Sequence, residues 1–211
     1  MIRNKIIAFL TCFLSCFALF AQSTDEMLKA GGAQLEKGNW QDALDTYTKV
    51  LQKDKANPAA YNFRAYANEK LNRYNFARAD YEHFLKIAPF NYEGLLGLAL
   101  LNQKDMHYTE SYDQINNLVE MFPDSVSAYI ARAGIEKERN MMEPCIYDWG
   151  EVIRLEPTNA DNYITRAELL IRVGRTEEAR RDLDKAVELG VSATSLKYLY
   201  KKTKKSKKSK N

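Results

Sequence analysis

Apolar and small residues recur along this chain in a pattern that predicts pairs of helices. Within residues 58–91, Tyr61, Ala65 and Ala67 lie at helical spacing and predict one face of a first helix. A polar break at 71–73 follows, and a second run has the same spacing. The second run consists of Tyr74, Ala77, Tyr81, Phe84, Leu85 and Ile87. The segment therefore predicts two antiparallel helices joined by a short turn.

The whole pattern repeats at an offset of 34 residues. Pro89 recurs as Pro123 and Pro157, and each proline closes a second helix because proline cannot continue one. Lys55 and Val191 take this place in the first and last units, which suits terminal units. Five units tile the chain without insertion: 24–57, 58–91, 92–125, 126–159 and 160–193.

Small residues recur at two places in every unit. Antiparallel helices approach closely only where side chains are small, so these places predict the crossing point within each pair. The eighth place holds Gly31, Ala65, Ala99, Ala133 and Ala167, and the twentieth holds Ala43, Ala77, Ser111, Cys145 and Ala179.

These small residues, the aromatic residue that opens the second helix and the closing proline resemble the tetratricopeptide repeat. The resemblance covers about four-fifths of the chain. It implies an all-α fold, a right-handed α-solenoid of five helix-turn-helix units whose concave face is made mostly by the first helices. Residues 194–201 are predicted to begin a capping helix. Pro144 predicts that the second helix of the fourth unit starts late.

The resemblance also implies which side chains line the concave groove. We expect Tyr66 and Leu100 to be the most open, because their place points furthest from the neighbouring unit. Gly97 and Gly134 lie mid-helix on this face, where they serve either backbone access for a ligand or close packing of an adjacent helix. The candidate partner-binding residues are Phe63, Tyr66, Leu96, Leu100, Ile130 and Ile164, with charged neighbours Glu69, Lys70, Lys104 and Glu138.

Arginine and aspartate occur together at a fixed spacing in three units. The other two units carry Ala30 with Thr46, and Leu98 with Gln114, so neither charge occurs without the other. We expect each arginine to form a structural ion pair with the aspartate of its own unit. An anion-binding site is the alternative interpretation. The pairs are Arg64 with Asp80, Arg132 with Asp148, and Arg166 with Asp182.

No catalytic set is recognisable in the sequence. His83 and His107 fall at unrelated places, and Cys145 takes a crossing place where a small residue is required. Phosphate-binding loops, dinucleotide fingerprints, zinc-ligand spacing and nucleophile elbows do not occur. The sequence therefore predicts a protein that is not an enzyme and that needs no cofactor or metal.

The first 21 residues read as a signal peptide. Arg3 and Lys5 precede an apolar run that ends in Ala21, without an acidic residue. The alternatives are an uncleaved anchor, although the run is short for a span, and lipidation at Cys16. The pattern predicts export, to the periplasm or as a secreted protein, and with this repeat type it favours a bacterial cell envelope.

The far end of the chain is basic and the middle is acidic. Eight tail lysines and two cations of the leader account for ten of the 31 basic residues, and all 28 acidic residues lie between them, which leaves the middle near −7. Residues 202–211 are predicted to be a disordered tail, either merely solubilising or in contact with an anionic membrane or polyanion. The eight lysines are Lys197, Lys201, Lys202, Lys204, Lys205, Lys207, Lys208 and Lys210.

These features together predict a protein–protein interaction scaffold or adaptor of the cell envelope, which binds a partner polypeptide in its concave groove. The alternative is a surface-associated accessory protein held to an anionic membrane or polyanion by its lysine-rich tail. Nucleic acid is not a predicted partner, because export separates the chain from it and the middle is acidic. The sequence does not identify the partner or the oligomeric state.

Overall fold

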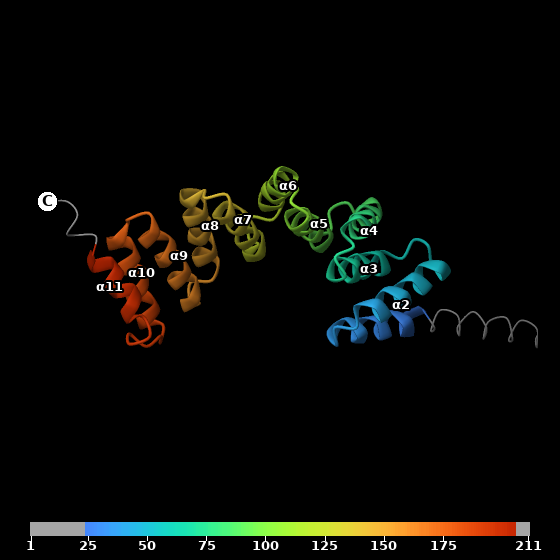
Figure 1. Cartoon of the computed structure of the whole chain (residues 1–211), viewed down its shortest axis with the longest axis horizontal. Coiled ribbons are helices and arrows are strands. Elements are labelled where there is room, and N and C mark those ends of the chain that lie inside the picture. The colour runs from blue at the N-terminus through green and yellow to red at the C-terminus, as the bar shows by residue number, and fades with distance from the viewer. Residues whose placement is uncertain (1–23, 206–211) are drawn as a thin grey trace, which may run out of the picture. The chain divides into compact units, whose positions relative to one another are not determined.

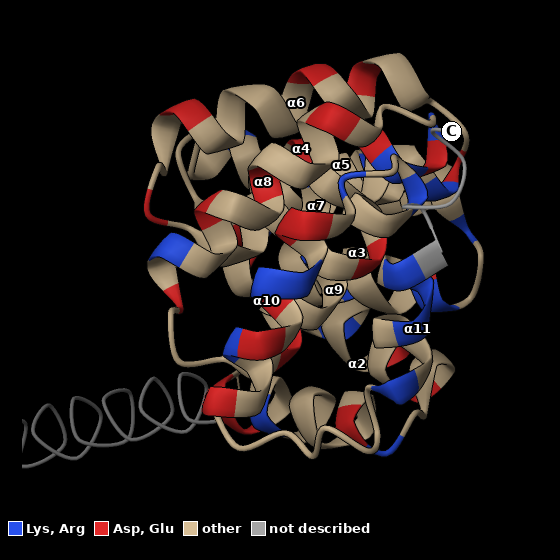
Figure 2. Cartoon of the chain, turned by 90° about the vertical axis from the view of Figure 1, so that its left-hand side faces the viewer, with Lys and Arg blue, Asp and Glu red and all other residues tan. Residues whose placement is uncertain are grey.

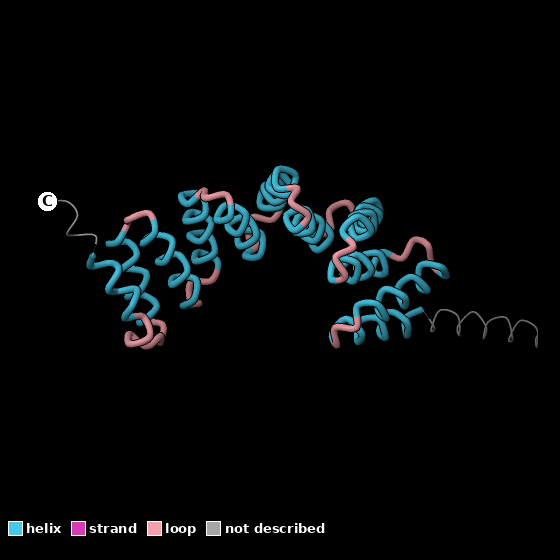
Figure 3. Tube along the Cα trace, viewed as in Figure 1, coloured by secondary structure: helices cyan, strands magenta, loops and turns pink. Residues whose placement is uncertain are grey.

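The computed structural model describes residues 24–205; the predicted signal peptide and the end of the tail lie outside the described part. Every regular element within that range is a helix, and short loops join the helices (Figures 1 and 3). The all-α fold predicted from the sequence is therefore confirmed. The chain packs as two compact units, here called the first half, up to Asp105, and the second half, from Met106 onward. This boundary falls inside the third predicted repeat.

Each half is built from consecutive helices that pack against one another. Second helices start every 34 residues from Trp40 to Thr176, and first helices do so from Pro58 to Ala160. The first half contains a helix over 24–36, α2 (Trp40–Lys53), α3 (Pro58–Lys70), α4 (Tyr74–Ile87) and α5 (Tyr92–Lys104). The second half contains α6 (Tyr108–Met121), α7 (Val126–Glu138), α8 (Met142–Leu155), α9 (Ala160–Arg172), α10 (Thr176–Glu188) and α11 (Lys197–Lys205).

The turn inside each helix pair has the same backbone conformation in all five repeats. The residue two positions before the second helix adopts a left-handed φ, which glycine and asparagine tolerate best. Met106, with φ 62°, is the one residue in this set that is neither glycine nor asparagine. The set is Gly38, Asn72, Met106, Asn140 and Gly174.

First helices begin at polar caps. The side chains of Asn57, Asn91, Ser125 and Asn159 each accept a hydrogen bond from a backbone N–H in the first turn of the following helix. The second helices have no such cap within the described residues. The expected late start of α8 is wrong: α8 begins at Met142, in register with the other second helices. Pro144 is tolerated there because N–H groups of the first turn have no acceptor inside the helix.

The small residues at the two recurring places are all buried at the crossing of their helices. The Cys145 thiol donates a hydrogen bond to the Ala133 carbonyl at 3.3 Å, which joins the two places of one pair directly. At Gly31, an added Cβ would lie 2.6 Å from the ring of Tyr47. The crossings therefore require small side chains, as the sequence pattern indicated.

The final helix differs in its bounds from the predicted cap. α11 begins at Lys197 and ends at Lys205, whereas the prediction was 194–201. Leu196 and Thr203 are each 5% exposed, so this segment packs against the rest of the second half. Residues 202–205 thus belong to a helix and not to the predicted disordered tail. Residues 206–211 lie outside the described part.

Candidate protein-binding faces

The first half exposes two aromatic side chains on α3. Phe63 is 42% exposed and Tyr66 is 37% exposed. The Phe63 ring stacks on buried Tyr47 with centroids 5.6 Å apart, and the Tyr66 ring meets Trp40 edge-on at 6.0 Å. Each ring is therefore anchored on one side by another aromatic residue and is open to solvent on the other. We call Phe63, Tyr66, Leu96 and Leu100 the first-helix face of the first half.

Cations border these rings. The Lys70 ammonium lies 4.9 Å from the Tyr66 centroid and 5.9 Å from that of Trp40, within the range of cation–π attraction. Lys104 Nζ on α5 donates to Glu69 Oε1 on α3 at 2.5 Å, and this hydrogen bond is the main cause that raises the pKa of Lys104. Glu69 is 8% exposed, so the pair fastens α3 to α5 beside the aromatic residues.

The leucines on α5 are less open than expected. Leu96 and Leu100 are both half-buried, so the expectation that Leu100 would be among the most open residues is wrong. Phe63 is also more exposed than Tyr66. At Gly97 an added Cβ would lie 2.7 Å from the Tyr81 ring on α4, so this glycine serves close helix packing. The neighbouring helix, and not the place in the repeat alone, determines which side chains remain open.

In the second half the two predicted residues have different surroundings. Ile130 on α7 is 42% exposed. Ile164 on α9 is half-buried and packs against the main apolar cluster of this half. At Gly134 nothing lies within 4 Å of an added Cβ, so the backbone of α7 is open there. Backbone access thus remains the interpretation of Gly134, in contrast to Gly97.

The structure places each of the three arginines on the aspartate of its own repeat. In every pair Arg Nε donates to Oδ2 and Nη2 donates to Oδ1, which is the bidentate geometry favoured for arginine and carboxylate. The distances are 3.0 and 2.6 Å for Arg64 and Asp80, 2.8 and 2.6 Å for Arg132 and Asp148, and 2.8 and 2.7 Å for Arg166 and Asp182. The aspartates are nearly buried, at 1–7% side-chain exposure, and the arginines are partly exposed. This geometry is that of structural ion pairs.

A buried glutamate stands beside one of these pairs. Glu136 on α7 is 2% exposed, and its Oε1 accepts a hydrogen bond from the Tyr112 hydroxyl at 3.0 Å. Its Oε2 is buried and has no hydrogen-bond partner among the described residues. Burial, together with the nearby charge of Asp148, raises the pKa of Glu136 to about 7. The sequence did not single out this residue.

No family model matches the sequence. Rat sperm-associated antigen 1 is 30% identical over 116 residues, which are 54% of this chain and 13% of that protein. Human tetratricopeptide repeat protein 13 is 34% identical over 92 residues, which are 41% of this chain and 11% of that protein. The chain therefore spans only a small part of the length of these curated relatives.

Solved structures are similar over most of the chain. Pseudomonas aeruginosa PilF has a TM-score of 0.72 at 16% identity, over 88% of this chain and 85% of that one. MamA from Desulfovibrio magneticus has a TM-score of 0.67 at 17% identity, over 79% and 94%. YrrB, described as a TPR protein with an unusual peptide-binding site, has a TM-score of 0.62 at 18% identity, over 88% and 97%. The chain has the tetratricopeptide-repeat fold.

Within this tetratricopeptide-repeat (TPR) fold, the residues capable of chemistry are scattered. His83 stacks on Tyr61, while His107 lies on a different helix pair. Burial raises the pKa of the Cys145 thiol to about 11, so this thiol is not activated as a nucleophile. Between residues 24 and 205, no three histidine, cysteine or acidic side chains group as a metal site. Over the same range, no helix is both long and apolar enough to cross a membrane.

The last helix of the TPR fold carries a basic face (Figure 2). Lys197, Lys201, Lys202 and Lys204 are all exposed on α11. Tyr198 is 66% exposed, and the Lys202 ammonium lies 4.5 Å from its ring centroid. Five of the eight lysines near the end of the sequence therefore lie in this helix, and three of them, Lys202, Lys204 and Lys205, fall in the segment predicted to be a disordered tail.

Sequence reasoning missed how Trp40 and Lys70 gather around Tyr66. Trp40 opens α2, whereas Lys70 closes α3, so the two residues belong to different repeats. Aromatic residues open the second helices of the first three repeats, as Trp40, Tyr74 and Tyr108, so Trp40 does not stand out in the sequence. Only the packing of α2 on α3 brings these side chains together.

Proposed function

We propose that this chain is a non-enzymatic interaction scaffold of the cell envelope that binds a partner polypeptide on the first-helix faces of its repeats. The observation that carries the proposal is the pair of solvent-open aromatic residues on α3, Phe63 and Tyr66. Aromatic anchors bury much area at small entropic cost and are enriched at binding hot spots. The signal-peptide pattern in the sequence supports the envelope location.

The chemistry of this face suits a segment of mixed character. Lys70 offers a cation beside the rings, whereas the Lys104–Glu69 pair is already neutralised. A partner segment with apolar or aromatic side chains would cover Phe63 and Tyr66 and leave its polar groups at the rim. YrrB is a TPR protein for which a peptide-binding site is described, which agrees with this use of the fold.

The test uses paired substitutions in the mature chain. Tyr66→Ser together with Ile130→Ser removes one exposed side chain from the first helices of each half. Phe90→Ser is the matched control, because Phe90 is 77% exposed but lies in the loop after α4. Partner capture from envelope extract should fall about tenfold or more in the double variant and stay unchanged in the control. Capture that survives in a folded double variant would contradict the proposal. Circular dichroism melting checks folding.

The basic face of α11 supports a second candidate function, contact with an anionic surface. Four exposed lysines on one helix contribute roughly 1 kcal/mol each near an anionic membrane at low salt. Changing Lys197, Lys201, Lys202 and Lys204 to Gln should weaken binding to phosphatidylglycerol vesicles at least about tenfold. The control changes four exposed lysines elsewhere: Lys29, Lys37, Lys49 and Lys86. Equal loss in both variants would assign the effect to total charge and not to α11.

A further inference from the structure

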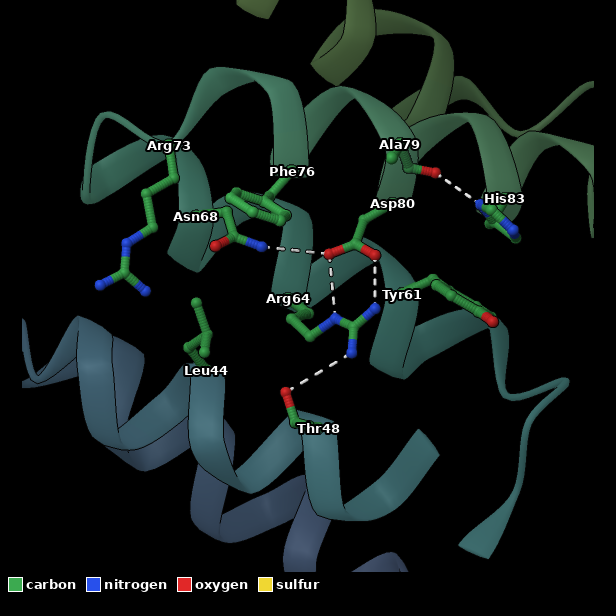
Figure 4. Close-up of a pocket in the computed structure, with 10 residues that line it drawn as sticks. All are labelled: Leu44, Thr48, Tyr61, Arg64, Asn68, Arg73, Phe76, Ala79, Asp80 and His83. Carbon is green, nitrogen blue, oxygen red and sulfur yellow. Dashed lines mark hydrogen bonds and ion pairs between the residues drawn. The ribbon is translucent and has the colours of Figure 1, made fainter. Parts of the chain in front are cut away.

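A groove of about 450 Å³ opens on the first half, between α2 and α4, with α3 as its floor (Figure 4). We call it the α2–α4 groove. It is lined by side chains that do not belong to the first-helix face. These are Leu44 and Thr48 of α2, Tyr61, Arg64 and Asn68 of α3, Arg73, and Phe76, Ala79, Asp80 and His83 of α4.

The floor of the groove is polar, but its charged side chains already pair with each other. Asp80 accepts two hydrogen bonds from Arg64 and one from Asn68 Nδ2 at 3.2 Å. Arg64 Nη1 also reaches the Thr48 hydroxyl at 3.4 Å. Because the Asp80 carboxylate and the Arg64 guanidinium neutralise each other, the floor carries little net charge and contributes to ligand binding mainly through its shape.

The walls of the groove are aromatic and open. Phe76 is 67% exposed, so most of its ring is open to solvent at the groove. On the same side, the His83 ring stacks on Tyr61 at 5.3 Å, and its Nδ1 lies 2.8 Å from the Ala79 carbonyl. These rings supply an apolar wall that a small side chain can cover.

Arg73 supplies the charge at one end of the groove. It is exposed, and its guanidinium has no hydrogen bond or ion pair within residues 24–205; Figure 4 shows it beside Asn68 and Phe76. The equivalent residue three repeats later is Arg175, which is fully engaged. Arg175 Nε and Nη2 donate to Glu178 at 2.7 Å each, and Nη1 donates to Glu143 at 2.7 Å.

The difference between the two arginines lies in their neighbours. Phe76 occupies the place of Glu178, and Gln41 occupies the place of Glu143. Gln41 instead donates to Asp45 on its own helix at 2.9 Å. In the second half, a pocket at the same places of the repeat is lined by Arg175, Glu178 and the Arg166–Asp182 pair. The second half thus provides its own carboxylates where the first half has none.

We propose that the α2–α4 groove is a second polypeptide-binding site, which takes a segment with a carboxylate next to an apolar side chain. The carboxylate pairs with Arg73 in the way that Glu178 pairs with Arg175, and the apolar side chain covers Phe76 and Leu44. A bidentate pair with arginine gives orientation as well as affinity. The proposal does not depend on binding at the first-helix face, because the two surfaces share no residue.

The probe for this site is a labelled peptide, blocked at both ends, with two glutamates around a leucine and a phenylalanine. The matched peptide carries glutamines in place of the glutamates. Fluorescence anisotropy with the folded chain should show binding of the acidic peptide, weakened by salt, and roughly tenfold weaker binding of the neutral one. Equal affinity for the two peptides, or failure of the acidic peptide to bind, would overturn the proposal.

Three variants of the chain separate the causes. Arg73→Gln should weaken binding of the acidic peptide about tenfold. Phe76→Glu should abolish binding of the acidic peptide, because the new carboxylate pairs with Arg73 as Glu178 pairs with Arg175. Phe76→Gln removes the ring without adding a charge, so it should retain part of the binding. Wild-type affinity in Phe76→Glu would refute the pairing.

A converse variant and a control complete the test. Glu178→Phe with Glu143→Gln should create a second peptide site in the second half, seen as a doubled stoichiometry. An unchanged stoichiometry would overturn the comparison between the two arginines. Tyr66→Ser with Ile130→Ser must leave peptide binding intact, and a loss there would move the probe to the first-helix face.

Discussion

Glu136 holds the place that asparagine holds two repeats earlier. There, Asn68 Nδ2 donates to Asp80, the aspartate of an ion pair. In the fourth repeat the corresponding aspartate is Asp148, and Glu136 Oε2 is buried without a partner among the described residues. A protonated Glu136 can donate to Asp148 as the amide does, whereas an ionised one sets two carboxylates side by side. We therefore expect Glu136 to be neutral in the folded state at moderate pH.

The size of the effect follows from the pKa. The folded-state pKa of about 7, against an ordinary value of 4.5, corresponds to roughly 3 kcal/mol. The groups that face Glu136 are Tyr112 from α6, Arg132 from α7, and Asp148 and Cys145 from α8. Burial and Asp148 raise the pKa, and Tyr112 and Arg132 oppose them in part.

The sign of the pH dependence is set by where the proton binds more tightly. Because the pKa of Glu136 is raised on folding, the folded state holds the proton between pH 4.5 and about 7 while the unfolded state loses it. The contribution of this residue to the free energy of unfolding therefore falls as pH rises through this window. Above about pH 7, Glu136 is ionised in both states, and its burial lowers the free energy of unfolding by the full amount.

Glu136→Gln tests this reasoning, because glutamine keeps the acceptor for Tyr112 and supplies a permanent donor toward Asp148. Urea unfolding followed by circular dichroism, from pH 5 to pH 8, should give similar stabilities near pH 5. At pH 8 the variant should be more stable by about 2–3 kcal/mol. Glu168→Gln, at an exposed glutamate on α9, is the control and should change little at any pH.

A stability difference between Glu136→Gln and the natural chain that stays constant across this range would refute the reasoning. So would a variant that is less stable at pH 8, since it would show that an ionised Glu136 is stabilised in the fold. Carbon-13 NMR of the Glu136 carboxyl measures its pKa independently of unfolding.

Three further predictions concern stability measured by denaturant unfolding. Tyr47→Phe should stabilise the chain by about 1 kcal/mol, because the buried Tyr47 hydroxyl lacks a hydrogen-bond partner among the described residues; a loss of stability would show that it has one. Met106→Gly should stabilise by about 0.5–1 kcal/mol, because Met106 has a left-handed φ of 62° and an exposed side chain; no gain would mean that the turn is not strained. Arg166→Met should cost about 2–4 kcal/mol by leaving the Asp182 carboxylate buried and unpaired, and Arg166→Met with Asp182→Leu should cost less; the reverse order would contradict a structural ion pair.

The sequence by itself determined the features that lie within one repeat. The helix pair, its crossing at small residues and the arginine–aspartate contact depend on residues at most 16 positions apart in antiparallel helices. Such contacts recur whenever the spacing recurs, so the 34-residue pattern is sufficient to predict them. The expected late start of α8 was wrong because the N–H groups of a first turn make no hydrogen bond inside the helix, so proline removes none there.

Only the tertiary structure decided what depends on neighbouring repeats. Leu100 is half-buried and Phe63 is open, although both stand on the same predicted face. Gly97 is required by Tyr81 of the preceding helix, while Gly134 faces open space. Exposure is set by the side chains of adjacent helices, which differ from repeat to repeat, and a periodic pattern in one sequence does not contain that information.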